Sequence, residues 1–316
     1  MRAVVSGADG FIGSHLVPAL EKEGWDIVGL VEPRQGRKVD GTGMRSVDIV
    51  TGTGLDRAFR GADVAVHLAA RNHVLKETSL DPLAEYRKVN VVGTRNVIRA
   101  ARDASVGTFV HMSSVKAMRE ESAGVLDEDA PCFPSTPYGI SKLESEEVVR
   151  TETAGSEMSS IILRLPMVYG PGNKGNFPRM IRWANGGYPF PVFHPDNLRS
   201  MIYVGNVVAG IKEILKASLQ GSTTYILKDR EDYSIRMVFI AVCNSLGKKP
   251  RYFPVPSLAV RLGGLLSEDF RKVTGSFRVS SGKIEKELGF SPPFSLEEGI
   301  ARTVAWYKRS VQSRSV

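Results

Sequence analysis

A tyrosine and a lysine four residues apart, Tyr138 and Lys142, have the types and spacing that acid/base chemistry requires. Residues i and i+4 share one face of an α-helix, and Pro137 suits the first turn of a helix that carries them. A free phenol titrates near about 10, but a neighbouring ammonium favours the phenolate. The pair therefore predicts a tyrosine base tuned by Lys142, although a Tyr and a Lys at this spacing are also common on helix surfaces.

An apolar run that starts at Phe109 ends in two serines, Ser113 and Ser114. A hydroxyl at the carboxyl end of a parallel strand lies in the crevice where open α/β sheets bind their ligands. There it can hold the oxygen of a substrate that is oxidised or reduced. A helix cap or a turn is the alternative use of such a serine.

Three glycines, Gly7, Gly10 and Gly13, follow the first apolar run, with Phe11 and Ile12 before the last of them. Glycine permits a tight turn and a close approach of backbone to a pyrophosphate, and the helix that begins here offers free N–H groups. The position of the loop between a strand and an amphipathic helix favours a dinucleotide site over a plain turn.

Later strand ends supply the other expected contacts with a dinucleotide. Glu32 follows the second strand, where a carboxylate binds the adenosine ribose and repels a 2′-phosphate, so the sequence favours NAD. Three basic residues follow it and leave NADP open: Arg34, Arg37 and Lys38. Leu68, Ala69 and Ala70 are residues at a strand end where backbone passes close to the cofactor, or simply core residues.

The elements that position these residues alternate over the first half of the chain. Short apolar runs are separated by helical patterns, such as residues 83–102, which predicts βαβ units and a parallel sheet covered on both faces. After Pro166, stretches rich in Gly and Pro break the pattern. We expect an α/β, Rossmann-type doubly wound domain over residues 1–168, with 200–218 returning to it. A smaller C-terminal α/β substrate lobe would comprise residues 169–199 and 219–316.

Composition narrows the class of protein. The chain has 316 residues, 42% hydrophobic and 24% charged, with no apolar run of membrane-spanning length. Its net charge of +8 suits a nucleic acid, an anionic membrane surface or a small polyanion, but no nucleic-acid-reading motif accompanies it. Cys132 and Cys243 form no metal or disulfide pattern, and the histidines have no metal spacing. We expect a cytoplasmic protein without a metal, a nucleic-acid partner or membrane insertion.

In this order and at these distances, the glycine loop, the strand-end serine and the Tyr-x-x-x-Lys pair resemble the NAD-dependent epimerase/dehydratase branch of the extended short-chain dehydrogenases. The resemblance spans nearly the whole chain and implies a triad of Ser114, Tyr138 and Lys142. Ser114 and Tyr138 would bind the reacting oxygen, with Tyr138 as acid/base, and Lys142 would hold the nicotinamide ribose. Other residues that the resemblance assigns to the cofactor are Asp48, Ile49, Asn90 and Pro166.

The stretches around Lys116, 173–177 and 198–201 are similar to bacterial surface-polysaccharide enzymes, namely UDP-N-acetylhexosamine 4-epimerases and UDP-4-keto-6-deoxy-hexosamine 4-reductases. This similarity implies oxidoreduction at C4 of a nucleotide-diphosphate hexose, and a UDP-hexose is the expected substrate. We also expect a homodimer. Asn176 and Arg199 would hold the diphosphate, and His73 would lie near the substrate. Relatives that remove water carry an Asp-Glu pair where this chain has Val115 and Lys116, so we expect no dehydration. Reduction of a small non-nucleotide carbonyl compound and non-catalytic cofactor sensing on the same fold are the alternatives.

Overall fold

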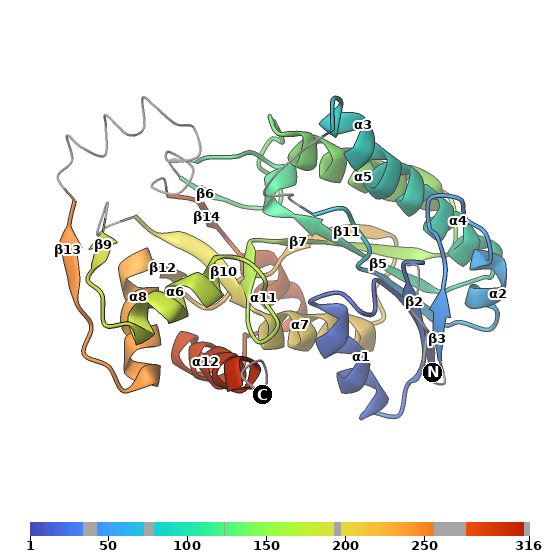
Figure 1. The fold of residues 1–316 in the computed structure, drawn as a ribbon. Helices are drawn as coiled ribbons and strands as arrows, with labels where there is room; N and C mark the ends of the chain where they lie inside the picture. Colours follow the sequence, from blue (N-terminus) through green and yellow to red (C-terminus); the bar gives the residue numbers. More distant parts are fainter. Residues whose placement is uncertain (34–42, 73–78, 123, 193–196, 256–275, 313–316) are drawn as a thin grey trace.

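The computed structural model describes residues 1–33, 43–72, 79–122, 124–192, 197–255 and 276–312. Its largest feature is a seven-stranded parallel sheet in the order β3-β2-β1-β4-β5-β7-β11 (Figure 1). The order runs outward from β1 on both sides, so the sheet is doubly wound and the predicted α/β fold class is confirmed. The strands are β1 (Arg2–Ser6), β2 (Asp26–Val31), β3 (Met44–Ser46), β4 (Val64–His67), β5 (Thr108–Ser114), β7 (Ser159–Leu165) and β11 (Ser222–Ile226).

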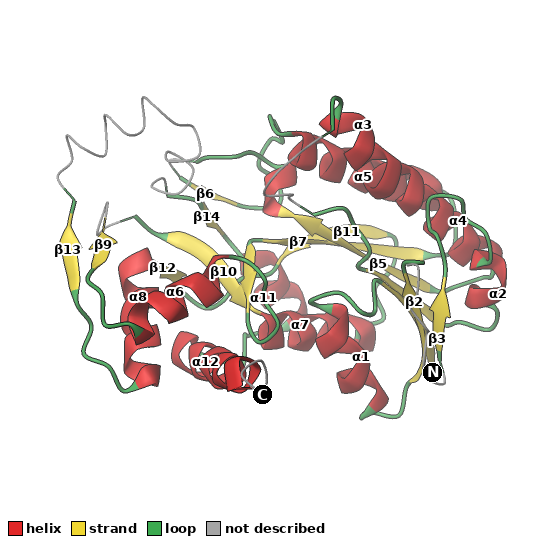
Figure 2. Ribbon diagram, in the orientation of Figure 1, coloured by secondary structure: helices red, strands yellow, loops and turns green. Residues whose placement is uncertain are grey.

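Helices cover both faces of this sheet and form two apolar cores with it (Figure 2). On one face α1 and α7 contribute Leu16 and Ile211, and on the other α2, α4 and α5 contribute Phe59, Ile98 and Val149. Because both faces are covered, the central strands are apolar almost throughout. The helices are α1 (Gly13–Glu21), α2 (Leu55–Phe59), α4 (Thr94–Asp103), α5 (Pro137–Thr153) and α7 (Val204–Lys216).

The helical pattern over residues 83–102 is not one regular α-helix. It consists of α3 (Pro82–Arg87), a π-helix η1 (Lys88–Gly93) and then α4. Asp81 caps α3 by accepting a hydrogen bond from the Ala84 N–H at 3.0 Å. Turns of π-helix are rare and frequently lie at functional sites. This one contains the buried Asn90.

Most of the remaining strands and helices build a second lobe around an apolar core of its own, whereas Leu126 and Val279 lie in a small separate cluster and Ile284 lies in the core of the large domain. Its centre is a three-stranded sheet, β12-β10-β8, and two short parallel pairs join β13 to β9 and β14 to β6. Helix α8 packs against both α6 and α12. The elements are β6 (Val125–Leu126), β8 (Met167–Tyr169), α6 (Asn176–Asn185), β9 (Phe190–Val192), β10 (Arg199–Tyr203), β12 (Asp232–Tyr233), α8 (Ile235–Leu246), β13 (Tyr252–Pro254), β14 (Arg278–Val279), α11 (Gly282–Leu288) and α12 (Leu296–Gln312).

The sheets bear on the division into domains. Within the range predicted to return to the large domain, α7 packs against α1, whereas β10 pairs with β8 of the small sheet. Strand β11 lies in the range predicted for the smaller lobe, yet it is the edge strand of the large sheet, and α11 packs beside it. Strand β11 therefore belongs with the large sheet. The domain boundaries at residues 168, 199 and 218 stay a prediction.

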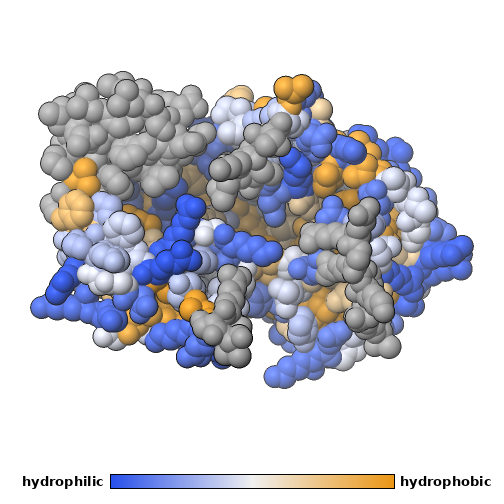
Figure 3. All heavy atoms as spheres, in the orientation of Figure 1, coloured by the Kyte–Doolittle hydropathy of each residue, from blue (hydrophilic) through white to orange (hydrophobic). Residues whose placement is uncertain are grey.

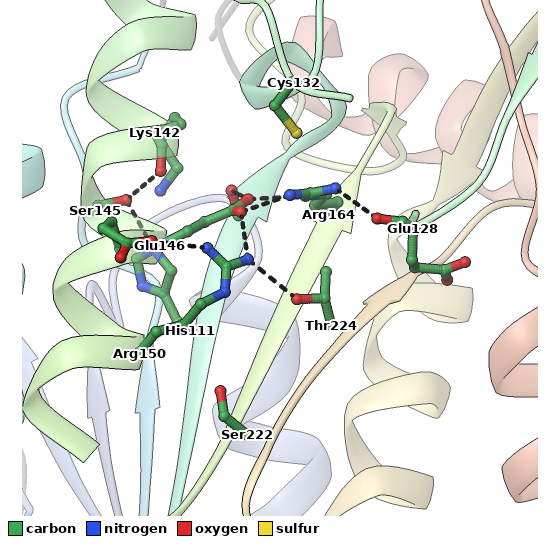
Figure 4. A network of polar contacts seen from close by, with 12 residues as sticks. His111, Glu128, Cys132, Lys142, Ser145, Glu146, Arg150, Arg164, Ser222 and Thr224 are labelled. Atoms are coloured by element: carbon green, nitrogen blue, oxygen red, sulfur yellow. Dashed lines mark hydrogen bonds and ion pairs between the residues drawn. The ribbon is translucent and has the colours of Figure 1, made fainter. Parts of the chain in front are cut away.

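Helix α5 turns a charged side chain, Glu146, into the interior, where it is fully buried (Figure 4). Arg164 of β7 donates two hydrogen bonds to it, at 3.0 and 2.8 Å, and Arg150 of α5 donates another at 3.0 Å. Ser113 of β5 adds a fourth, at 2.6 Å. Burial raises the pKa of Glu146, but these partners outweigh it and hold the pKa below the ordinary carboxyl value. The carboxylate thus fixes α5 to two strands of the sheet.

We predict that Arg164→Met lowers the free energy of unfolding by about 3–5 kcal/mol, because it leaves a buried carboxylate short of its main partner. The pKa of Glu146 is lowered by folding, so this stabilisation is present above the ordinary carboxyl pKa and is lost as the pH falls. The deficit of the variant should therefore shrink in acid. Urea unfolding at neutral and acidic pH measures both effects.

The matched control is Arg99→Met. The Arg99 side chain is 53% exposed, and the substitution removes its ion pair with Glu152. An exposed ion pair is worth about 0–1 kcal/mol. Equal losses of stability in the two variants would show that the buried pair does not hold α5 in place.

Candidate active site

The loop between β1 and α1 has no room for side chains at its glycines. Gly7 has a φ of +69°, and a Cβ there would lie 2.9 Å from the Ala69 backbone nitrogen. A Cβ on Gly10 would lie 3.0 Å from the Gly7 carbonyl oxygen, and one on Gly13 would overlap the same oxygen. Ile12, at the N-cap of α1, has no polar side chain to cap the helix. The loop therefore fits a pyrophosphate, as a dinucleotide would require.

Other predicted cofactor contacts lie close to this loop. The N–H groups of Leu68 and Ala69, just after β4, donate to the carbonyl oxygen and hydroxyl of Ser6 at 3.1 and 3.3 Å. Glu32 is exposed directly after β2. Among the remaining predicted contacts, Phe11, Asp48 and Ala70 are half-buried, and Ile49, Asn90 and Pro166 are buried. Arg34, Arg37, Lys38 and His73 lie outside the described residues.

The three predicted catalytic residues lie together at the end of β5. Ser114 closes that strand; its hydroxyl donates to the Leu165 carbonyl oxygen at 3.4 Å and accepts from the Lys116 N–H at 3.2 Å, and it lies close enough to Tyr138 to lower the pKa of the phenol. Tyr138 and Lys142 share one face of α5, whose N-cap Thr136 accepts a hydrogen bond from the Gly139 N–H at 3.2 Å. The expected helix begins at Pro137, as its sequence indicates.

Burial sets the charge of both ionisable groups. It raises the pKa of Tyr138 to about 12, against the nearby Ser114 hydroxyl, which lowers it. It lowers the pKa of Lys142 to about 8, against the Glu146 carboxylate, which raises it. The Lys142 Nζ donates to the Met112 carbonyl oxygen at 2.6 Å. In this arrangement the phenol is protonated at neutral pH, while most of the Lys142 charge is retained.

A set of hydrogen bonds, here called the Ser6–Tyr138 network, joins the end of β1 to the backbone of Tyr138, the tyrosine predicted to be catalytic. It passes through the side chains of β4, η1 and α4 before it reaches α5. In order, the contacts are Ser6 Oγ to His67 Nδ1 (2.6 Å), His67 Nε2 to Thr94 Oγ1 (3.0 Å), Thr94 Oγ1 to the Asn90 carbonyl oxygen (2.6 Å), Asn90 Nδ2 to Ser141 Oγ (2.9 Å) and Ser141 Oγ to the Tyr138 carbonyl oxygen (2.8 Å).

The donors of this network assign the proton on His67. Thr94 Oγ1 donates its hydrogen to the Asn90 carbonyl oxygen, so it accepts from His67 Nε2, and the unprotonated Nδ1 of the neutral ring accepts from the Ser6 hydroxyl. Burial, followed by the charge of Lys142, lowers the pKa of His67 to about 3, so the ring is neutral. His111 stacks on it with ring centroids 5.5 Å apart and contacts Ser145 Oγ at 2.9 Å.

The two residues predicted to hold a substrate diphosphate have different surroundings. Arg199 begins β10 and forms a bridge with Phe277, whose ring lies 5.3 Å from the Lys116 Nζ. This places Arg199 near the loop that follows Ser114. Burial lowers the pKa of Arg199, and the Glu121 carboxylate raises it. Asn176 is the exposed first residue of α6.

The two residues after Ser114 have no acid/base group available. Val115 is buried in a small apolar cluster. Lys116 forms an ion pair with Glu120 at 2.7 Å, and Glu120 also accepts a hydrogen bond from Thr136 at 2.6 Å. Glu120, the first acid after Ser114 in the sequence, is therefore already used to connect this loop to the cap of α5.

Sequence reasoning missed the polar residues beneath the triad. Glu146 and Arg150 continue the i, i+4 spacing of Tyr138 and Lys142, so the sequence itself places four polar residues on one face of the helix. His67 and His111 each interrupt an otherwise apolar strand, which is a signal of a buried and partnered side chain. Within the described residues, no group of three or more His, Cys, Asp or Glu is arranged to hold a metal ion.

Comparisons with known proteins agree with this geometry. The NAD dependent epimerase/dehydratase family matches residues 3–235. UDP-glucose 4-epimerase of Vibrio cholerae is 31% identical over 307 residues, 95% of this chain and 93% of that protein. N-acetyl-alpha-D-glucosaminyl-diphospho-ditrans,octacis-undecaprenol 4-epimerase of Escherichia coli O157:H7 is 31% identical over 316 residues, with 95% and 93% covered.

A solved structure of MoeE5 in complex with UDP-glucuronic acid and NAD has a TM-score of 0.80 and 26% identity, covering 98% of this chain and 100% of that one. These matches confirm the predicted resemblance, and with it an NAD-dependent enzyme. The chain belongs to the NAD dependent epimerase/dehydratase family.

Proposed function

We propose that this enzyme is a 4-epimerase of a nucleotide-diphosphate hexose, with a UDP-hexose as the first substrate to test. The observation that carries the proposal is the arrangement of Ser114, Tyr138 and Lys142 beside a loop that fits a pyrophosphate. Two relatives at 31% identity are named as 4-epimerases, which supports reaction at C4.

In the proposed mechanism, Ser114 and Tyr138 hold the C4 oxygen of the sugar, and Tyr138 takes and returns its proton. Burial alone keeps Tyr138 protonated, with a pKa of about 12, so the base form requires positive charge nearby. The buried Lys142 supplies such a charge from one turn along α5. NAD, when bound, would supply reversible hydride acceptance at C4 of the sugar. The glycine loop and Glu32 would bind the pyrophosphate and adenosine ribose.

The surroundings of the triad support epimerisation without loss of water. Dehydration needs one group to protonate a departing hydroxyl and another to remove a carbon-bound proton. Val115 offers neither, and the Lys116–Glu120 ion pair engages both of its members. We therefore propose that the reaction leaves C6 untouched.

Other reactions use the same groups. A UDP-4-keto-6-deoxy-hexosamine 4-reductase would need the same triad, and a reductase of a small non-nucleotide compound or a cofactor sensor would share the fold. A sensor has no need for Ser114, Tyr138 and Lys142 in register. A sugar carried on a polyprenyl diphosphate is a second candidate substrate, because the E. coli relative is named for one. The homodimer stays a prediction.

We predict that NAD-loaded enzyme converts one member of a panel into an isomer of unchanged mass. The panel contains UDP-glucose, UDP-N-acetylglucosamine, UDP-glucuronic acid and N-acetylglucosaminyl diphospho-polyprenol, and products are read by mass spectrometry. Tyr138→Phe should lower turnover by about three powers of ten or more while NAD still binds. Tyr188→Phe, at a side chain that is 62% exposed, is the control. A product lighter by one water would contradict the proposal, and net consumption of NADH with a 4-keto sugar would favour the reductase.

A second prediction concerns recognition of the diphosphate. Arg199 has the planar fork that suits phosphate and lies near the loop after Ser114. Arg199→Ala should weaken UDP binding by roughly ten- to a hundredfold in a calorimetric titration. Arg179→Ala, at an exposed position of α6, should bind as the wild type does. Unchanged affinity in Arg199→Ala would remove this residue from the site.

A third prediction concerns the pH profile. If catalysis needs the Lys142 ammonium, kcat/KM should fall above the Lys142 pKa of about 8. Glu146 raises that pKa, so Glu146→Gln should move the alkaline limb to lower pH. Glu147→Gln changes a neighbouring carboxylate that is 72% exposed and should leave the limb in place. If Glu146→Gln lowers kcat/KM at every pH without moving the alkaline limb, Glu146 acts only as a structural residue.

A further inference from the structure

The positive charge of the chain is concentrated in two stretches of sequence that form most of the second lobe. Residues 169–199 and 219–316 hold 20 Lys and Arg against 10 Asp and Glu, whereas the rest of the chain holds 22 against 24. A substrate diphosphate carries only about two negative charges. Recognition of the substrate therefore explains a small part of this excess.

The imbalance is strongest along one side of that lobe. Residues 176–192 and 235–255 contain α6, β9, α8 and β13, and together they hold six Lys and Arg and no Asp or Glu. Strands β9 and β13 pair with each other, and α8 contacts α6 and β9. Five of the six basic residues are exposed: Arg179, Arg182, Lys248, Lys249 and Arg251.

Large aromatic side chains are exposed on the same segments. Trp183 is 46% exposed, Tyr188 62%, Tyr252 38% and Phe253 48%. The rings of Trp183 and Tyr188 touch, with centroids 5.9 Å apart, and the Arg236 guanidinium lies 4.6 Å from the centre of the Tyr252 ring. In Figure 3 the region of β9 and β13, at the left, shows hydrophobic atoms among hydrophilic ones. We call the following set the aromatic edge: Arg182, Trp183, Tyr188, Lys248, Lys249, Arg251, Tyr252 and Phe253.

We propose that the aromatic edge docks this enzyme on an anionic membrane surface. Trp and Tyr are favoured at the headgroup level of a bilayer, where one end of the side chain is apolar and the other wet. Lys and Arg beside them are attracted to anionic lipids. No helix among the described residues is long and apolar enough to cross a membrane, so the attachment is peripheral.

The charge pattern favours a lipid surface over other partners. Protein interfaces commonly surround an aromatic centre with a polar rim in which complementary charges fix the register. All the charged residues in residues 176–192 and 235–255 are basic. A uniformly positive surface suits a uniformly negative one, such as a layer of anionic lipids, in which no single orientation has to be specified. The proposal does not depend on which sugar the enzyme converts, since docking is read out without turnover.

The test is co-sedimentation of the full chain with vesicles of phosphatidylglycerol and phosphatidylcholine, or of phosphatidylcholine alone. We expect binding to the anionic vesicles only, weakening as salt rises. Reversal of charge at Lys248→Glu, Lys249→Glu and Arg251→Glu together should weaken binding by about a hundredfold or more. The matched control reverses Lys22, Arg57 and Arg60, exposed bases of the large domain, and should bind as the wild type does.

Fluorescence places the contact. Trp183 is exposed, whereas Trp25 and Trp306 are half-buried, so docking should shift the emission of Trp183 to shorter wavelength. Trp183→Phe should abolish the shift. Absence of binding, equal binding to both kinds of vesicle, or a larger loss in the control than in the aromatic-edge variant would overturn the proposal. Tighter binding of a single-stranded oligonucleotide than of anionic vesicles would also overturn it in favour of nucleic acid.

Discussion

The structure depends on burying Lys142 and Glu146 on a helix face that also carries the half-buried Tyr138 and Arg150. Tyr138, Lys142, Glu146 and Arg150 follow one another at intervals of one turn along α5, and that face is pressed against the sheet. Each buried polar group must find a partner or cost more than the packing gains. The partners come from the Ser114 hydroxyl, the Met112 carbonyl oxygen, the Arg164 guanidinium and the Thr224 hydroxyl. Since β5, β7 and β11 supply them, α5 has one position and one rotation on the sheet.

This constraint also sets the chemistry. A lysine in an apolar interior would lose its charge near neutral pH, and the Glu146 carboxylate one turn away opposes that loss. Glu146 remains ionised there because Arg164, Ser113 and Arg150 hold it. The Ser6–Tyr138 network adds a second link, from β1 through His67 and the π turn at Asn90. The glycine loop and the helix that carries Tyr138 and Lys142 are thus positioned by polar contacts with the strands of the sheet.

The sequence predicted much of this arrangement because its signals are local. Glycine spacing, apolar strands and a Tyr-x-x-x-Lys pair each act within a few residues, so the sheet, the loop and α5 follow from them. The partnership of Glu146 with Arg164 joins residues 18 apart, and that of Ser6 with His67 joins residues 61 apart. Such pairs depend on which strands become neighbours, which no local pattern specifies. The place of β11 in the large sheet was missed for the same reason, because an edge strand of mixed polarity is typical of either lobe.

The two lobes differ in where their charged residues lie and in how well acids and bases are balanced. The predicted catalytic residues lie among a few buried charges that neutralise one another, and residues 1–168 and 200–218 are nearly balanced in acids and bases. Buried charges interact strongly in a medium of low dielectric constant and are little affected by salt, so they can fix a proton on one atom. The second lobe instead exposes an unbalanced excess of Lys and Arg, which acts through water and weakens with salt. An exposed excess of that kind selects a class of anionic surface or ligand, whereas the buried groups select the reaction. Changes of charge on the surface of the second lobe should therefore alter binding to anionic surfaces or ligands without altering the pKa of Tyr138.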